Sequence, residues 1–202
     1  MLTRLKHIDT IVACDIANNV FHHTDLWFEN GEILKIGPLD RIPDADYDCS
    51  DMIVYPGLIN VHHHLYQYFT RNLRKVQDYT LFDWLKALYG VWKNINEKTV
   101  LLSSCAGMAE LMRYGCTTCF DHHYVFPKDA GDLIAAQFEA AKVLGIRMHA
   151  SRGSMDLSEN DGGLPPDSVV QNVDGILKDT ENAIRQYHDP NRFSMRRVVV
   201  AP

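Results

Sequence analysis

The chain lacks the signatures of several simple function classes. No apolar run is long enough to span a bilayer, and the residues after Met1 lack the apolar core of a signal peptide. The formal net charge is −6, and no basic stripe interleaved with aromatic residues is present. These absences argue against membrane insertion and against nucleic-acid binding through phosphates. We therefore expect a cytoplasmic protein with neither a membrane nor a nucleic-acid partner.

Nucleotide-binding motifs and a disulfide framework are also missing. No G-x-G-x-x-G follows a predicted strand, and no G-x-x-x-x-G-K-[ST] occurs. The five cysteines are an odd number and widely spaced, which argues against a set of disulfides. Cys116 and Cys119 fit C-x-x-C but follow a helix-ending glycine and are predicted to lie in a strand. Redox cysteines of this type lie at a helix N-terminus, so a redox role is disfavoured.

What is present divides into two parts. The 202 residues are 46% hydrophobic, enough for one core or for a small domain plus part of a larger one. Residues 1–55 are predicted to be β-rich, with a short strand at 10–14 and a hairpin of strands 25–29 and 32–36. The hairpin turn is predicted from Asn30-Gly31, a pair that favours positive φ.

From residue 56 the pattern changes to alternating strands and helices. Such repeated units predict a parallel barrel or a doubly wound sheet. We prefer the barrel, because the glycine-rich nucleotide motifs are missing and histidines follow the strands. After the first strand, the expected elements are a helix capped by Asn96 and ended by Gly115, a strand at 116–120, a helix at 129–144, a strand at 146–149, a helix from Ser168 that ends before Asp189, and a strand at 197–202.

A His-x-His motif follows the first of these strands. The apolar run that begins at Ile53 is broken by Pro56-Gly57 and ends at His62 and His64. Alternate side chains of an extended strand share a face, so the two imidazoles are predicted to point the same way. Neutral imidazole suits zinc or ferrous iron, and the C-terminal ends of barrel strands carry the chemistry. A structural pair of histidines is the alternative, because His-x-His alone is a common pattern.

Histidines also follow two later strands. His122 and His123 come after the strand at 116–120, and His149 ends the strand at 146–149. Buried polar side chains are normally hydrogen-bonded, so a structural role is the favoured interpretation of these three.

The motif at Pro56–His64 resembles the first barrel strand of the amidohydrolase superfamily. The N-terminal β-rich segment is similar to the first half of that family's small β-sandwich. The segments 63–67, 117–124, 152–157 and 162–171 are more specific, and they resemble the branch that contains 8-oxoguanine deaminase and hydroxydechloroatrazine ethylaminohydrolase.

The resemblance implies an α/β fold. The chain would be the first half of a metal-dependent (β/α)8 TIM-like barrel preceded by part of a small β-sandwich domain. Residues 1–55 would form the partial sandwich, and residues 56–202 the N-terminal part of the barrel, truncated near its fourth strand.

The implied activity is hydrolytic deamination of a purine-type ring, 8-oxoguanine or guanine-like, with release of ammonia. One divalent metal, zinc first and Fe(II) as the alternative, would turn water into the nucleophile. An s-triazine is the alternative substrate. On matching positions, the resemblance implies His62 and His64 as metal ligands, Gln67 and Tyr124 as substrate contacts, and Trp92 and Arg152 as weaker candidates for substrate contact, with wall packing as the alternative for Tyr124 and Trp92.

The family's other functional groups have no counterpart here. Its remaining metal ligands and its proton-transfer pair come from the fifth, sixth and eighth strands, so no catalytic residue is expected within these 202 residues. We expect the isolated chain to be inactive, and the intact protein to be a homo-oligomer that acts on a small molecule. The alternative from another class is an inert truncated homologue that serves only as an interaction module.

Overall fold

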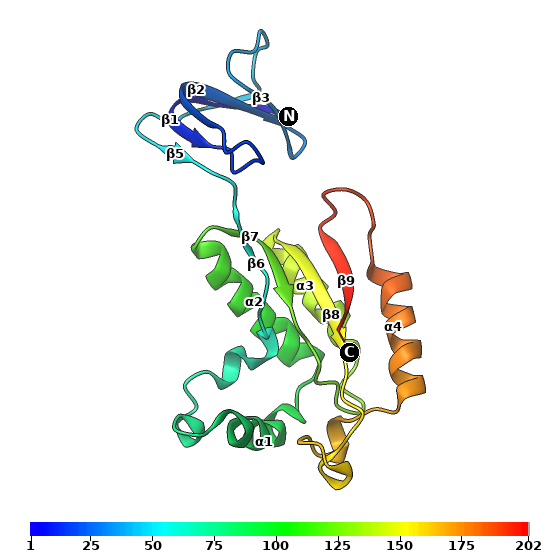
Figure 1. Cartoon of the computed structure of the whole chain (residues 1–202). Helices are drawn as coiled ribbons and strands as arrows, with labels where there is room; N and C mark the ends of the chain where they lie inside the picture. Colours follow the sequence, from blue (N-terminus) through cyan, green and yellow to red (C-terminus); the bar gives the residue numbers. More distant parts are fainter. Residues whose placement is uncertain (202) are drawn as a thin grey trace. The chain divides into compact units, whose positions relative to one another are not determined.

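The computed structural model describes residues 1–201, which divide into two units (Figure 1). The first unit is Met1–Gly57, and the second begins at Leu58. The domain boundary expected at residue 55 lies just before this division. Among the described residues, no helix combines the length and the apolar character that a bilayer crossing requires.

The first unit is a single mixed sheet. Its strand order is β3-β2-β1-β4, and β5 pairs with β1 as well. β1 pairs antiparallel with β2 and parallel with β4 and β5. The strands are β1 (Leu2–Val12), β2 (Val20–Glu29), β3 (Glu32–Ile36), β4 (Ala45–Asp48) and β5 (Ile53–Val54).

The predicted hairpin is confirmed, whereas the strand predicted at 10–14 is confirmed only for residues 10–12, which end a longer strand. Asn30 and Gly31 have φ of 52° and 84°, so both central residues of the turn take the left-handed conformation that it needs. The first strand instead runs from Leu2 to Val12, and Cys14 lies beyond it with a φ of 51°. A bulge at His7, with a φ of 58°, interrupts the alternation of side chains along this strand. The first half of the strand therefore shows no regular apolar–polar alternation in the sequence.

The second unit is built on a four-stranded parallel sheet in the order β6-β7-β8-β9. Parallel neighbours need a crossover, and here each crossover contains a helix: α2 packs on β7, α3 on β8 and α4 on β9. The strands are β6 (Leu58–Asn60), β7 (Cys116–Asp121), β8 (Arg147–Gly153) and β9 (Arg196–Ala201). The helices are α1 (Leu81–Trp92), α2 (Glu97–Arg113), α3 (Leu133–Leu144) and α4 (Val173–Tyr187), with 3-10 turns η1 (Leu65–Thr70), η2 (Arg74–Val76), η3 (Glu159–Asp161) and η4 (Asp167–Val169).

The predicted limits of α2 are confirmed. The Asn96 side chain accepts a hydrogen bond from the Thr99 amide at 3.0 Å, and Gly115 follows the helix with a φ of 83°. A capping acceptor and a left-handed glycine are the usual beginning and end of a helix.

Two helices begin later than predicted, and one helix was not predicted. Positive φ at Asp129 and Gly131 keeps the chain in a turn until Asp132 caps α3, so the helix expected from 129 begins at Leu133. The helix expected from Ser168 begins at Val173, because the preceding residues form η4 and Asn172 caps α4. Helix α1 has no counterpart among the elements predicted from the sequence.

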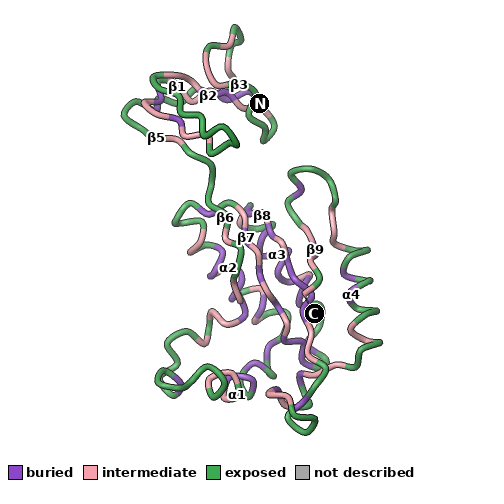
Figure 2. Tube along the Cα trace, in the orientation of Figure 1, coloured by how far each residue is buried: buried purple, intermediate pink, exposed green. Residues whose placement is uncertain are grey.

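The core of the second unit lies between the sheet and its helices. Figure 2 shows buried residues along β7, β8 and α3. Met108 on α2 and Met148 on β8 are fully buried, and full burial of such a side chain contributes about 1.5–3 kcal/mol. This packing fixes the C-terminal ends of β6 and β7, where the polar residues gather.

Candidate metal and substrate site

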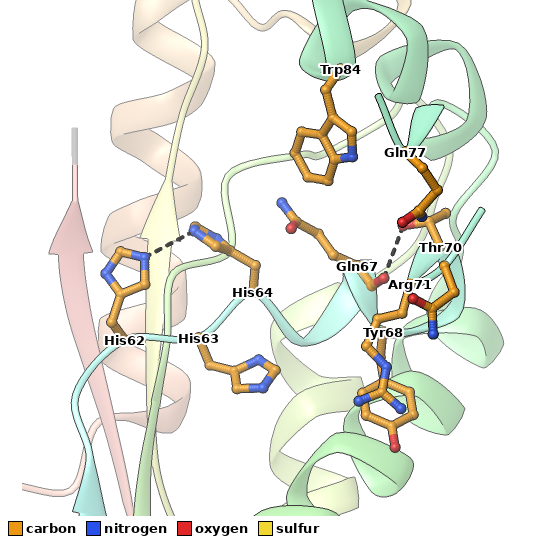
Figure 3. A pocket seen from close by; sticks show the side chains of 10 residues that line it. His62, His63, His64, Gln67, Tyr68, Thr70, Arg71, Gln77 and Trp84 are labelled. Carbon is orange, nitrogen blue, oxygen red and sulfur yellow. Dashed lines mark hydrogen bonds between the residues drawn. The ribbon is translucent and has the colours of Figure 1, made fainter. Parts of the chain in front are cut away.

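His62 and His64 converge just beyond the end of β6. Their Nε2 atoms are 3.2 Å apart, and their ring centroids are 4.9 Å apart. Figure 3 shows the two rings facing each other while His63 points away from them. The period of two that aligns alternate side chains thus persists for a few residues after the last ladder pair of β6.

The His64 ring is held in one tautomer. Its Nδ1 lies 2.7 Å from the backbone oxygen of His122, which can only accept, so Nδ1 carries the proton and Nε2 keeps its lone pair. The pKa of His64 is lowered, chiefly by burial, which favours the neutral ring. A neutral imidazole with a free Nε2 lone pair is the form that binds a metal.

The separation of the two rings fits a shared ion. Zinc–nitrogen bonds of about 2.05 Å at a tetrahedral angle place two ligand nitrogens about 3.3 Å apart. The observed 3.2 Å between Nε2 atoms agrees with that value. Within residues 1–201 no group of three or more His, Cys, Asp or Glu side chains is arranged to hold a metal. The described residues therefore offer two candidate ligands, fewer than the three or four protein ligands that a zinc site has.

A cavity of about 710 Å³ opens beside this pair (Figure 3). Gln67 on η1 and Trp84 on α1 line it together with the histidines. Gln67 Nε2 donates to the Tyr66 hydroxyl at 3.2 Å, which fixes one end of its amide. The complete lining is His62, His63, His64, Gln67, Tyr68, Thr70, Arg71, Asn72, Gln77 and Trp84.

Tyr124 stands next to His64 on the β7 side. The centroids of the two rings are 5.5 Å apart and the rings are nearly perpendicular. Gly153 at the end of β8 holds the segment before Tyr124, because its amide donates to the His123 oxygen at 2.8 Å. Tyr124 is half-buried, so part of its ring remains open to solvent.

Trp92 and Arg152 are not brought to this cavity. Trp92 is 1% exposed, and its Nε1 donates to the Thr70 hydroxyl at 3.2 Å, as expected for wall packing. Arg152 is also buried, and its guanidinium lies 3.8 Å from the centroid of the Phe126 ring. The same group donates to Asp179 Oδ2 at 3.1 Å, beside a separate cavity of about 200 Å³.

The other histidines differ from one another. His123 is fully buried and its Nε2 donates to the Val125 oxygen at 2.9 Å, which is a structural role. The His122 ring lies 5.5 Å from the His64 ring between centroids, but its backbone makes the contact with His64. His149 lies within β8, where burial lowers its pKa.

Sequence reasoning missed two residues of this region. Trp84 lies on the unpredicted helix α1, whose start carries a recognisable signal: the Thr80 hydroxyl donates to Asp83 at 2.7 Å across a T-x-x-D spacing. Asp121 ends β7 and contacts the backbone after His64, a relation between distant positions that no local pattern reveals.

Comparison with known proteins supplies the context for this site. Residues 53–195 match the amidohydrolase family. The chain is 41% identical over 195 residues to an 8-oxoguanine deaminase of Pseudomonas aeruginosa. It is 39% identical over 207 residues to a hydroxydechloroatrazine ethylaminohydrolase of Pseudomonas sp. strain ADP. Each alignment covers 95% of this chain and 43% of the relative, so the chain spans less than half the length of these proteins.

A solved structure agrees with the fold. The crystal structure of an atrazine chlorohydrolase from Arthrobacter aurescens TC1 complexed with zinc superposes with a TM-score of 0.91 at 30% identity. The match covers 98% of this chain and 46% of that one. The predicted fold class, part of a (β/α)8 barrel preceded by part of a small β-sandwich, is confirmed.

Proposed function

Because this chain belongs to the amidohydrolase family, we propose that the protein carrying it is a metal-dependent hydrolytic deaminase of a purine-type ring. The substrate would be 8-oxoguanine or a guanine-like base, and ammonia would be released. The observation that carries the proposal is the His62–His64 pair, with Nε2 atoms 3.2 Å apart at the end of a parallel strand. The 41% identity to an 8-oxoguanine deaminase supports the substrate class.

His62 and His64 would hold the metal through their Nε2 atoms. A bound divalent ion such as zinc lowers the pKa of water to near neutrality and thereby supplies the nucleophile. The contact from His64 Nδ1 to the His122 oxygen would leave the Nε2 lone pair free for such an ion. Zinc is the metal we propose first, and Fe(II) suits the same ligands.

Gln67 and Tyr124 would bind the ring. The Gln67 amide lies in the cavity beside His64, where it can exchange hydrogen bonds with the polar edge of a base. Tyr124 presents a half-buried ring next to His64 and can pack against a planar substrate. A site built on such groups discriminates against analogues that leave them unpaired.

An s-triazine is the second candidate substrate. The 39% identity to a hydroxydechloroatrazine ethylaminohydrolase favours it nearly as strongly as the purine relative favours the first. Both rings are planar and carry exocyclic nitrogen, so the same cavity and the same hydrolytic chemistry would serve either.

The test uses the intact protein and compares 8-oxoguanine, guanine and a hydroxylated triazine in an ammonia-release assay, together with metal analysis. His64→Ala is expected to lose both metal and turnover, whereas His22→Ala, a histidine of β2 in the first unit, keeps both. An active, metal-loaded His64→Ala protein would contradict the proposed function. A wild-type protein that binds no metal and releases no ammonia would favour the interaction-module alternative.

Gln67→Ala is the substrate test. It should lower kcat/KM, because the bound transition state loses about 1–3 kcal/mol of stabilisation when a buried polar partner is left unsatisfied. The loss should differ among the three substrates. Gln186→Ala, the same change on the exposed face of α4, serves as the matched control and should behave as wild type. An equal loss of kcat/KM on all three substrates would assign Gln67 a structural role.

A further inference from the structure

A buried carboxyl group contacts the backbone next to the proposed metal-binding histidines. Asp121, the last residue of β7, is fully buried. Its Oδ1 accepts a hydrogen bond from the Leu65 amide at 2.5 Å, and its Oδ2 accepts one from Gln137 Nε2 on α3. A carboxylate removed from water persists only where donors satisfy it, so these contacts define its position.

Asp121 completes a set of three contacts that bracket His64. The His122 amide donates to the His63 oxygen at 2.8 Å, which fixes the backbone before His64. His64 Nδ1 donates to the His122 oxygen at 2.7 Å, which fixes the ring. The Leu65–Asp121 bond fixes the backbone after it. Two adjacent residues of the β7 end therefore constrain three adjacent residues of the ligand segment.

The contact with Leu65 also caps a helix. Leu65 is the first residue of η1, and its N-cap, His64, makes no side-chain capping bond. The amide of this first residue has no partner within the helix, and Leu65 is fully buried, so water cannot take the place of Asp121. Asp121 thus caps η1 from another strand, and η1 carries Gln67.

We propose that Asp121 is a positioning residue for His64, and that Gln137 in turn orients the Asp121 side chain. The inference rests on the proposed function, because it concerns the same metal site. Asp121 sets the tilt of the His64 ring through the backbone on its C-terminal side, so that Nε2 faces His62. Partners of metal-binding histidines outside the ligand set typically change metal affinity by about 10–100-fold when mutated.

Three variants of the intact protein separate positioning from general stability. Asp121→Ala removes both contacts. Asp121→Asn can keep both contacts. Its Oδ1 can accept from the Leu65 amide, and its amide nitrogen can donate to Gln137 Oε1 once the Gln137 amide turns over. In the wild type this Oε1 has no hydrogen-bond partner among residues 1–201. Cys119→Ala is the matched control, because it truncates another fully buried side chain of the same strand, two residues before Asp121.

The first measurement is zinc affinity by competition with a chelator. We expect Asp121→Ala to weaken zinc binding by roughly 10–100-fold. We expect Asp121→Asn and Cys119→Ala to bind zinc as the wild type does. A folded Asp121→Ala protein with wild-type zinc affinity would overturn the inference. If Asp121→Ala does not fold, Gln137→Leu decides instead: it leaves Asp121 unsupported on one side and should weaken zinc binding, and unchanged affinity counts against the inference.

The second measurement uses metal-free protein with 15N-labelled histidine. In the wild type, the His64 ring should carry its proton on Nδ1, and Asp121→Ala should show a mixture of tautomers. If the role of Asp121 is purely structural, Asp121→Ala should lower the stability of the protein and leave the His64 tautomer unchanged. The readouts also separate this inference from the proposed function. A wild-type protein that binds zinc but releases no ammonia refutes the deaminase, and the zinc affinities and tautomers of the variants still decide the role of Asp121.

Discussion

Replacing Gly153 with alanine should destabilise the protein and disturb the site. A Cβ at this position would lie 2.7 Å from the His123 oxygen and 2.7 Å from Tyr124 Cβ. Both distances are shorter than real contacts allow, and one neighbour is a backbone atom that cannot rotate away. The strand end must therefore separate from the segment before Tyr124.

The magnitude follows from three contributions to the free energy of unfolding. Overpacking of this kind costs about 1–3 kcal/mol. Weakening the hydrogen bond from the Gly153 amide to the His123 oxygen, 2.8 Å long, costs about 0.5–1.5 kcal/mol more. The reduced freedom of the unfolded chain returns about 0.4–1 kcal/mol. We expect a net loss of about 0.5–4 kcal/mol, together with lower turnover in the intact protein as Tyr124 moves.

Gly90→Ala is the matched control, and its expected effect on the free energy of unfolding has the opposite sign. Gly90 lies inside α1, and a Cβ there would meet nothing within 4 Å. Alanine inside a helix is favoured over glycine by about 0.5–1 kcal/mol, so this variant should be more stable than wild type. Urea unfolding followed by circular dichroism measures both variants. If Gly153→Ala proved as stable as Gly90→Ala, the close approach of β8 to the residues before Tyr124 would be refuted.

Two further predictions concern a helix cap and a buried acid. Asn96→Ala should lower the free energy of unfolding by about 1 kcal/mol, because the Thr99 amide loses its acceptor, and Asn96→Asp should restore it in the same urea assay. Burial raises the pKa of Asp121 to about 7, while burial lowers that of neighbouring His123 to about 3, so Asp121 is the member of this pair that titrates between pH 4 and 7. In this range Asp121 itself holds a proton in the folded state that it lacks in the unfolded state, which contributes a fall in stability of up to about 1.4 kcal/mol per pH unit as pH rises. The lowered pKa of His123 contributes a slope of the opposite sign, so the contribution of Asp121 is measured as the difference in slope between the wild type and a variant at this position. Asp121→Asn should remove this slope, and a wild-type slope in that variant would contradict the assignment.

Local patterns predicted the elements whose signals are short-range. The Asn30-Gly31 turn and the limits of α2 depend on φ preferences and on capping within four residues, and both are confirmed. The helices α3 and α4 begin later than predicted, and before α4 the apolar residues Val169 and Val170 continue the helical spacing into the preceding turn. Only the positive φ values and the capping side chains of Asp132 and Asn172 show where these helices begin.

The candidate site was likewise predictable where it depends on short-range spacing. The period-two spacing of His62 and His64 depends on the strand alone, and the structure brings their Nε2 atoms together. Trp84 could not be placed, because it lies on α1 and reaches the cavity only through the packing of distant parts of the chain. Trp92, which the resemblance implied as a substrate contact, lies in the core, since its indole donates to the Thr70 hydroxyl instead of lining the cavity.

The orientation of His64 shows why sequence patterns identify ligands more readily than they identify what orients them. Its Nδ1 donates to a backbone oxygen, and every residue carries one, so nothing in the side chain of His122 marks its carbonyl as the acceptor. Replacing that side chain leaves the carbonyl in place. The tautomer of His64 therefore depends on whatever holds the backbone around residue 122: Asp121 on one side, and the contact of Gly153 with the His123 oxygen on the other. Substitutions at Asp121 and Gly153 would therefore alter the proposed metal site without changing His62 or His64.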